Sequence, residues 1–264
     1  PVDDEIPASE MPGHAAVYFH RLGTDPTKDR LIHPPTGDPR TFIFPDLSRD
    51  GRLLFLYIMH GWSRTDVYYR RLRRGRPAPG KFRPFVVGKP ARYSVVAEAG
   101  KVFVRTNEGA PRYRLFRVDP RRMERRRWKE IVAQDREAVL TGFDVVGGHL
   151  SLLYMRKAST RLRIARLDGK LVRTVSFPGI GTASGLVGHP EDDTAYYSYS
   201  SFTTPTTVYR TSVRRGGREV YFKLEVPVDP KPYVEEQVSY KSRDGTPVTM
   251  FIVRSRAMRR DGST

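Results

Sequence analysis

Hydrophobic and polar residues repeat along the chain at a nearly constant interval. Five short segments show the near-alternation of apolar and polar residues, rich in β-branched and aromatic types, that is typical of a β-strand. They are Val17–Leu22, Asp66–Leu72, Tyr113–Val118, Leu162–Leu167 and Val208–Val213. Their last residues are 50, 46, 49 and 46 positions apart. A β unit that recurs every 40 to 50 residues or so predicts the blades of a β-propeller.

The residues between these copies complete units of four strands. Leu53–Met59 is almost continuously apolar, which predicts an inner strand covered on both faces. Glycine-containing turns separate the segments. No segment shows the 3.6-residue apolar period of an amphipathic helix over more than two helical turns. The expected strands are 15–23 and 30–33; 41–44, 53–59, 66–72 and 82–87; 93–98, 101–106, 112–118 and 128–132; 139–146, 149–155, 161–167 and 171–177; 184–187, 194–200, 206–213 and 219–226.

The repeat stops at Pro227–Tyr233, where three prolines in seven residues predict a linker. Val238–Ser242 and Pro247–Ser255 follow as an expected hairpin. We therefore divide the chain into an acidic loop segment (1–14), a partial β-propeller of about four and a half four-stranded blades (15–229), and a linker with the start of a second domain (230–264). The first residue is not Met and the hairpin has no continuation, so we expect a piece cut from something longer.

Composition narrows the possible partners. The formal net charge is +18, but only 10 of the 47 basic residues are Lys and the Arg residues are scattered through every repeat. The one dense run, Arg121–Arg127, has a single adjacent aromatic residue, Trp128, whereas a nucleic-acid surface pairs basic residues with several exposed rings. We interpret the charge as a solvated surface and expect no nucleic-acid partner. No apolar run is long enough for a membrane span.

Catalytic and metal motifs are absent from the sequence. The stretch Gly181–Gly185 resembles a nucleophile elbow, but Ser184 stands one place late. The six His residues have no metal-ligand spacing, and each is expected to be a surface or packing residue. The acidic pair Asp192-Asp193 lacks the calcium-loop spacing and is expected in a solvated turn. We expect no catalytic residue, no metal and no cofactor in this chain. The absence of Cys excludes disulfides and is compatible with a reducing compartment, so we expect the cytoplasm, with the periplasm as an alternative.

Several motifs resemble one family. Residues 47–51 together with 61–68 are similar to a propeller blade of prolyl oligopeptidase, and so are residues 106–115 and 201–205. The most specific stretch, residues 242–253 (SRDGTPVTMFIV), resembles the strand pair that opens the α/β-hydrolase domain of that family. The motifs agree in order and spacing over nearly the whole chain.

The resemblance implies a fragment of a serine-type endopeptidase that cleaves short peptides after proline. In that family a seven-bladed propeller caps the hydrolase domain and excludes folded proteins by size. The catalytic Ser, Asp and His all lie in the hydrolase domain, downstream of the opening hairpin, so none can be assigned in this chain. The implied partners are the hydrolase domain in cis and proline-containing peptides, the implied full-length form is a monomer, and no cofactor is implied.

The family's propeller also lends side chains to the substrate pocket. By position these fall near Phe42 and Trp62, on either side of Leu53–Met59, where large apolar groups could contact the substrate residue two before the scissile bond. The other interpretation is that Phe42 and Trp62 pack between blades. Two alternatives to the peptidase also stay open: a non-enzymatic propeller scaffold for protein or peptide partners, and a basic nucleic-acid binder.

Overall fold

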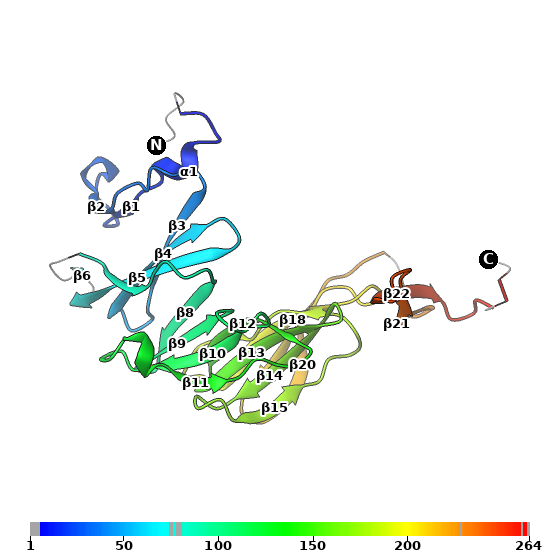
Figure 1. Ribbon diagram of the computed structural model, residues 1–264. Helices are drawn as coiled ribbons and strands as arrows, with labels where there is room; N and C mark the ends of the chain where they lie inside the picture. Colours follow the sequence, from blue (N-terminus) through cyan, green and yellow to red (C-terminus); the bar gives the residue numbers. More distant parts are fainter. Residues whose placement is uncertain (1–5, 74–75, 78–80, 228, 260, 263–264) are drawn as a thin grey trace. The chain divides into compact units, whose positions relative to one another are not determined.

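The computed structural model describes residues 6–73, 76–77, 81–227, 229–259 and 261–262. Its regular structure is almost entirely β, arranged as a series of small antiparallel sheets (Figure 1). None of the sheets in this part of the chain closes on itself. This confirms the expected all-β architecture of a partial propeller. No helix among the described residues is long and apolar enough to cross a membrane.

The chain divides into two compact units, which are described separately. One consists of Pro1–Pro111 and Leu115–Glu130, and the other of Arg112–Arg114 and Ile131–Thr264. The first holds the N-terminal sheet and two four-stranded blades, named here A and B. The second holds two further blades, C and D, and a C-terminal hairpin.

The N-terminal sheet has two strands, β1 (Val17–Phe19) and β2 (Arg30–His33), joined through the 3-10 helix η1 (Pro26–Lys28). Both expected strands are therefore present, the first shorter than its apolar pattern. The segment expected as a loop contains one helical turn, α1 (Met11–His14), which has a Pro in its first turn, where the missing amide hydrogen costs nothing. Residues 1–5 of that segment lie outside the described residues.

Blade A has the four strands that were predicted for residues 41–87, and it also has a short additional strand. Its elements are β3 (Thr41–Leu47), β4 (Leu53–His60), β5 (Arg64–Arg73), β6 (Arg76–Pro77) and β7 (Arg83–Val86). Strand β5 pairs with both β6 and β7, so the fourth strand of the blade is β7 and β6 only extends the end of β5. The turn after β3 is built by Ser48, whose hydroxyl oxygen accepts the Leu53 amide at 2.9 Å.

Blade B has the order β11-β10-β9-β8 and packs its face against blade A. Its strands are β8 (Tyr93–Glu98), β9 (Lys101–Thr106), β10 (Arg114–Val118) and β11 (Lys129–Val132), with the 3-10 helix η2 (Arg125–Arg127) before β11. One buried cluster joins the two blades, with Phe55 and Val67 from A and Val95 and Val104 from B. The Tyr57 hydroxyl adds a polar contact, because it lies 3.2 Å from both backbone polar atoms of Val95.

Blades C and D repeat this arrangement in the second unit. Blade C has β12 (Val139–Val146), β13 (His149–Arg156), β14 (Ser159–Ala165) and β15 (Leu171–Val175). Blade D has β16 (Thr182–Ala183), β17 (Val187–Gly188), β18 (Thr194–Ser200), β19 (Thr207–Ser212) and β20 (Gly216–Lys223). A second buried cluster lies between them and includes Leu162 and Ile164 of C and Tyr197 and Tyr209 of D.

The first strand of blade D differs from the prediction. A single strand over 184–187 was expected, but the structure has two separate two-residue strands: β16 ends just before that segment, and β17 begins at its last residue. The Ser184 amide still donates to the Ser198 carbonyl at 3.0 Å, but side chains take over the neighbouring bonds. The Ser184 hydroxyl accepts the Ser198 amide at 2.9 Å, and the Ser151 hydroxyl of blade C accepts the Leu186 amide at 3.1 Å. These partners lie far along the chain, which is why the local pattern did not reveal them.

The C-terminal hairpin is longer than predicted. Strands β21 (Tyr233–Lys241) and β22 (Pro247–Ser255) pair in continuous antiparallel register around the turn at Asp244-Gly245. The expected first strand began at Val238, and the expected linker ran to Tyr233. The Tyr233 amide instead closes a turn onto the Pro230 carbonyl at 3.0 Å, and the strand begins there.

Candidate functional site

The two predicted rim residues lie at one end of blade A, and both are exposed. Phe42 stands in β3 opposite Met59 of β4, and Trp62 stands in the turn that joins β4 to β5. The side chain of Trp62 is 85% exposed and that of Phe42 is 46% exposed. Neither belongs to the buried cluster between the blades in the part of the chain that the structure describes. Both are therefore available on the surface of this chain.

Beside this turn is a polar pocket of about 680 Å³ that the sequence analysis did not identify. His60 and Arg64 line it, and the buried carboxylate of Asp66 lies behind them, with its Oδ2 2.9 Å from Nε2 of His60. Asp66 also accepts the Gly88 amide at 2.8 Å, so its position is fixed from the next strand connection. His60 was predicted to be an ordinary surface or packing residue. The pattern of apolar and polar residues in β4 did not indicate that the Asp66 carboxylate would lie within hydrogen-bonding distance of His60.

Two other charges in the pocket neutralise each other. The Arg40 guanidinium donates to both oxygens of the Asp38 carboxylate at 3.0 and 3.1 Å. This hydrogen bonding holds the pKa of Asp38 below its ordinary value. The pocket therefore presents the His60 imidazole and the Arg64 guanidinium, which lies 3.7 Å from the Asp66 carboxylate. It is also lined by Gly61 and Ser63, the two neighbours of Trp62 in the turn. Such groups can hydrogen-bond the polar backbone and side chains of a peptide.

A second region of interest joins blade D to the hairpin. The Phe202 amide donates to Oε2 of Glu235 at 3.1 Å, and the Phe202 ring lies 5.3 Å from the ring of Phe251. Gln237 donates to the Lys157 carbonyl of blade C at 2.6 Å. A pocket of about 500 Å³, lined by residues of the 200–206 loop, the linker and the hairpin, lies at this contact. The first strand of the hairpin is thus attached to the rims of blades C and D.

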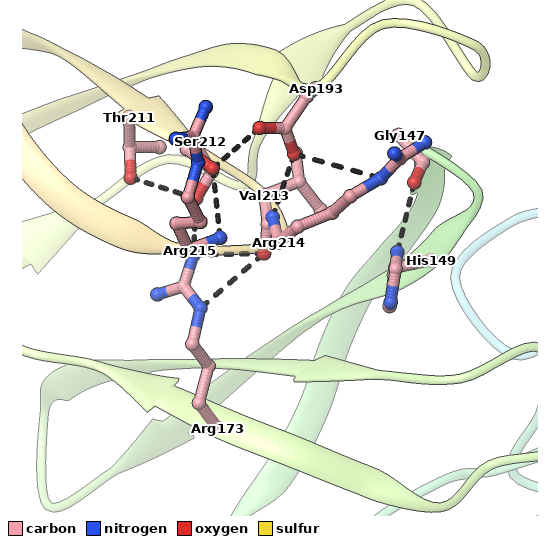
Figure 2. A network of polar contacts seen from close by, with 9 residues as sticks. All are labelled: Gly147, His149, Arg173, Asp193, Thr211, Ser212, Val213, Arg214 and Arg215. Carbon is pink, nitrogen blue, oxygen red and sulfur yellow. Dashed lines mark hydrogen bonds and ion pairs between the residues drawn. The ribbon is translucent and has the colours of Figure 1, made fainter.

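A polar network fixes blades C and D to each other (Figure 2). Nη2 of Arg173 on β15 donates to the Ser212 and Val213 carbonyls at 2.7 and 3.1 Å. Burial lowers the pKa of Arg173. The Asp193 carboxylate accepts the Ser212 hydroxyl at 2.6 Å and the Arg214 amide at 2.8 Å, which lowers its pKa. Asp193 was expected in a solvated turn. The structure shows that it holds the β19–β20 turn, a role that the sequence around Asp193 did not indicate.

The basic run Arg121–Arg127 does not form a stacking surface. Trp128 is buried, and the Arg125 guanidinium lies 4.8 Å from the centre of its indole ring while donating to the Glu108 carboxylate at 2.7 Å. The indole therefore serves as packing rather than as a platform for bases. Among the described residues, no group of three or more His, Cys, Asp or Glu is arranged to hold a metal ion.

The family profile described as prolyl oligopeptidase, N-terminal β-propeller domain, matches residues 1–223. The chain belongs to the prolyl oligopeptidase family. It is 31% identical, over 96% of its length, to a prolyl endopeptidase of Elizabethkingia miricola, and it spans 35% of that protein. It thus covers about a third of the length of the curated relatives it matches.

Solved structures agree with this membership. One of them comes from a structural and mechanistic study of two prolyl endopeptidases and their inter-domain dynamics. The match covers 99% of this chain and 38% of the chain in that structure, with 48% sequence identity and a TM-score of 0.91. Prolyl oligopeptidase B of Galerina marginata, solved with a 25mer macrocyclization substrate, matches 98% of this chain with a TM-score of 0.85 at 21% identity, and this second likeness concerns the fold alone. The resemblance noted in the sequence is confirmed.

Proposed function

We propose that this chain is the propeller part, with the opening hairpin of the peptidase domain, of a serine-type endopeptidase that cleaves short peptides after proline. The observation that carries this proposal is the similarity to prolyl endopeptidases over blades and hairpin together. The blades would restrict access by substrate size, and the catalytic Ser, His and Asp would be contributed by the domain that the hairpin opens. The domain bounds 15–229 and 230–264 belong to this proposal.

Within that enzyme we propose that Phe42 and Trp62 form part of the substrate-pocket rim. Their exposure at one end of blade A supports this role, because an exposed ring can take up an apolar side chain of a peptide. The neighbouring His60 and Arg64 would then offer hydrogen-bond donors to the peptide. We further propose that the full-length enzyme is a monomer without a cofactor, as the family resemblance implies, and that it lies in the cytoplasm, with the periplasm as the alternative.

The test uses the complete reading frame that contains this chain, expressed from its source DNA. We expect cleavage of a short chromogenic peptide after proline, inactivation by a serine-directed phosphonate, and no cleavage of a folded protein that contains exposed prolines. An in-frame product that binds peptides without cleaving them would instead support the propeller scaffold.

The rim assignment has its own test in the same enzyme. Trp62→Ala should raise KM several-fold while kcat changes less, because contact with a distant substrate residue contributes mainly to binding. Phe222→Ala removes an exposed aromatic side chain from β20, away from the proposed rim, and serves as the control. Equal kinetics for parent and Trp62→Ala would remove Trp62 from the rim and leave the peptidase assignment intact.

A further inference from the structure

We propose that a pocket at the ends of blades A and B binds a compact, multiply charged oxyanion of the phosphate type. The pocket has a volume of about 570 Å³, in the range of small-molecule sites. It lies at the Leu53 end of β4, whereas Trp62 follows the opposite end of that strand. The inference concerns the first compact unit alone and does not depend on the proposed peptidase activity.

The lining of this pocket is strongly basic. Two carboxylates, those of Asp50 and Asp119, also line it, so the lining carries five positive and two negative charges. The five basic residues are Arg52, Arg71, Lys101, Arg117 and Arg121. Each blade contributes some of them, which brings together cations that are as much as 69 positions apart in the sequence. The net charge of +3 in a small concave space favours an anion with more than one charge.

The two carboxylates are engaged in forming their own turns. Asp50 accepts the Ser48 hydroxyl at 2.7 Å and the Arg52 amide at 3.0 Å. Asp119 accepts the Arg121 amide at 2.8 Å. Their hydrogen bonds therefore go to local backbone and hydroxyl donors rather than to the cationic side chains.

Most of the cationic groups have no internal counter-charge. The Arg52 guanidinium lies 3.8 Å from Asp50, a weak and exposed ion pair. No carboxylate among the described residues lies within the 4 Å ion-pair distance of Lys101, Arg117 or Arg121. Three unpaired cations around one pocket repel one another, and a bound anion would relieve that repulsion.

The elements that carry these cations are held in place. Arg71 is paired with Leu53 in the β4–β5 register, and its Nη2 donates to the Pro120 carbonyl, which ties the segment after β10 to blade A. Lys101 is the first residue of β9, and its backbone lies opposite that of Glu98 in the antiparallel β8–β9 register. Buried Leu53 and Val118 form apolar parts of the lining. The backbone of these strands is already ordered, so only the side chains of these cations lose conformational freedom when an anion binds.

The types of residue in the lining select the class of ligand. Four of the five cations are arginines, whose planar fork donates two parallel hydrogen bonds to a phosphate or carboxylate. None of the described lining residues is aromatic, so there is no ring on which a nucleobase could stack. These features favour a small phosphate compound over a nucleic acid.

The test is isothermal titration calorimetry of the 264-residue chain with inorganic pyrophosphate, with ionic strength held constant by sodium chloride. We expect saturable binding with one site per chain. Arg121→Gln and Lys101→Gln should each weaken the affinity about tenfold, because each removes one charge-assisted contact. Arg126→Gln is the matched control: it removes an exposed charge from the same basic run but does not line the pocket, and it should change the affinity less than about twofold.

A thermal-unfolding measurement on the same samples checks that the variants fold and that the anion binds the folded state. Pyrophosphate should raise the Tm of the parent and of Arg126→Gln, and raise it less in Arg121→Gln and Lys101→Gln. The proposal is overturned if the parent shows no saturable heat. Equal weakening by Arg126→Gln and Arg121→Gln would also overturn it, because the attraction would then come from the overall charge rather than from this pocket.

Discussion

Arg173 of blade C donates from Nη2 to the backbone carbonyl of Ser212 in blade D at 2.7 Å (Figure 2). The two residues are 39 positions apart and belong to different sheets. The same guanidinium also reaches the Val213 carbonyl, so one half-buried cation satisfies two acceptors at the end of β19. A propeller blade cannot bury its faces alone, and this contact is one of the polar links that supplement the apolar cluster between C and D.

Replacing Arg173 should destabilise the chain through these two carbonyls. Arg173→Met keeps most of the apolar stem but removes the donors, and we expect a loss of about 2 kcal/mol in the free energy of unfolding. Chemical denaturation followed by circular dichroism measures it. Arg214→Met is the control, because its ion pair with Asp193 is exposed and long, at 3.9 Å, and its loss should cost under about 0.5 kcal/mol. Equal losses in the two variants would contradict the link.

Substitutions at two neighbouring glycines in the β12–β13 turn should distinguish the destabilisation caused by steric overlap from that caused by an unfavourable backbone conformation. Both have positive φ, but a Cβ on Gly147 would lie 2.9 Å from Cβ of Val213 and 3.0 Å from the Asp192 carbonyl oxygen, whereas Gly148 has open space. Gly148→Ala should cost about 1 kcal/mol from the left-handed backbone alone. Gly147→Ala should cost about 3 kcal/mol, because steric overlap is added. The denaturant midpoints of the two variants give the difference in stability. Similar midpoints would contradict the prediction, because they would show that Val213 and Asp192 can move aside without destabilising the chain.

Acid should weaken the β19–β20 turn through Asp193. Its pKa is lowered from the ordinary 3.8 mainly by the Ser212 hydroxyl, so the folded chain binds fewer protons at this group than the unfolded chain. The resulting stability is fully present above the unfolded value and is lost as pH falls through the lower folded value. Asp193→Asn should therefore be less stable than the parent at pH 7 and lose less stability on acidification below about pH 4. Unfolding curves between pH 7 and pH 3 test this, and parallel profiles would refute it.

The contact between Phe202 and the hairpin should control how often β21 and β22 open. Removing the ring in Phe202→Ala deletes its contact with Phe251, worth about 1 kcal/mol, so hairpin amides should exchange about fivefold faster. Hydrogen–deuterium exchange with peptide resolution measures the effect. Phe222→Ala, which removes a half-exposed ring from β20, should leave the hairpin rates unchanged. Acceleration in both variants would indicate a general loss of stability.

Much of blades A to C could be predicted from the sequence because their strands alternate locally. The expected segments 93–98 and 101–106 coincide with β8 and β9, since a period of two, followed by a tight turn, is complete within a dozen residues. The prediction was poorest for the first strand of blade D and for the start of β21, where the partners are the Ser151 hydroxyl of another blade and the Pro230 carbonyl of the linker. Hydrogen bonds of that kind leave no periodic trace in the sequence.

By itself the sequence determined the β class, the blade repeat and the family, because alternation, turn residues and motif order are properties of neighbouring residues. Only the tertiary structure decided that Arg173 joins two blades and that the cations of Arg71, Lys101 and Arg117 surround one pocket. The physical reason is the geometry of the propeller. Packing blade against blade brings together side chains some 30 to 50 positions apart, and their shared chemistry arises only from that packing.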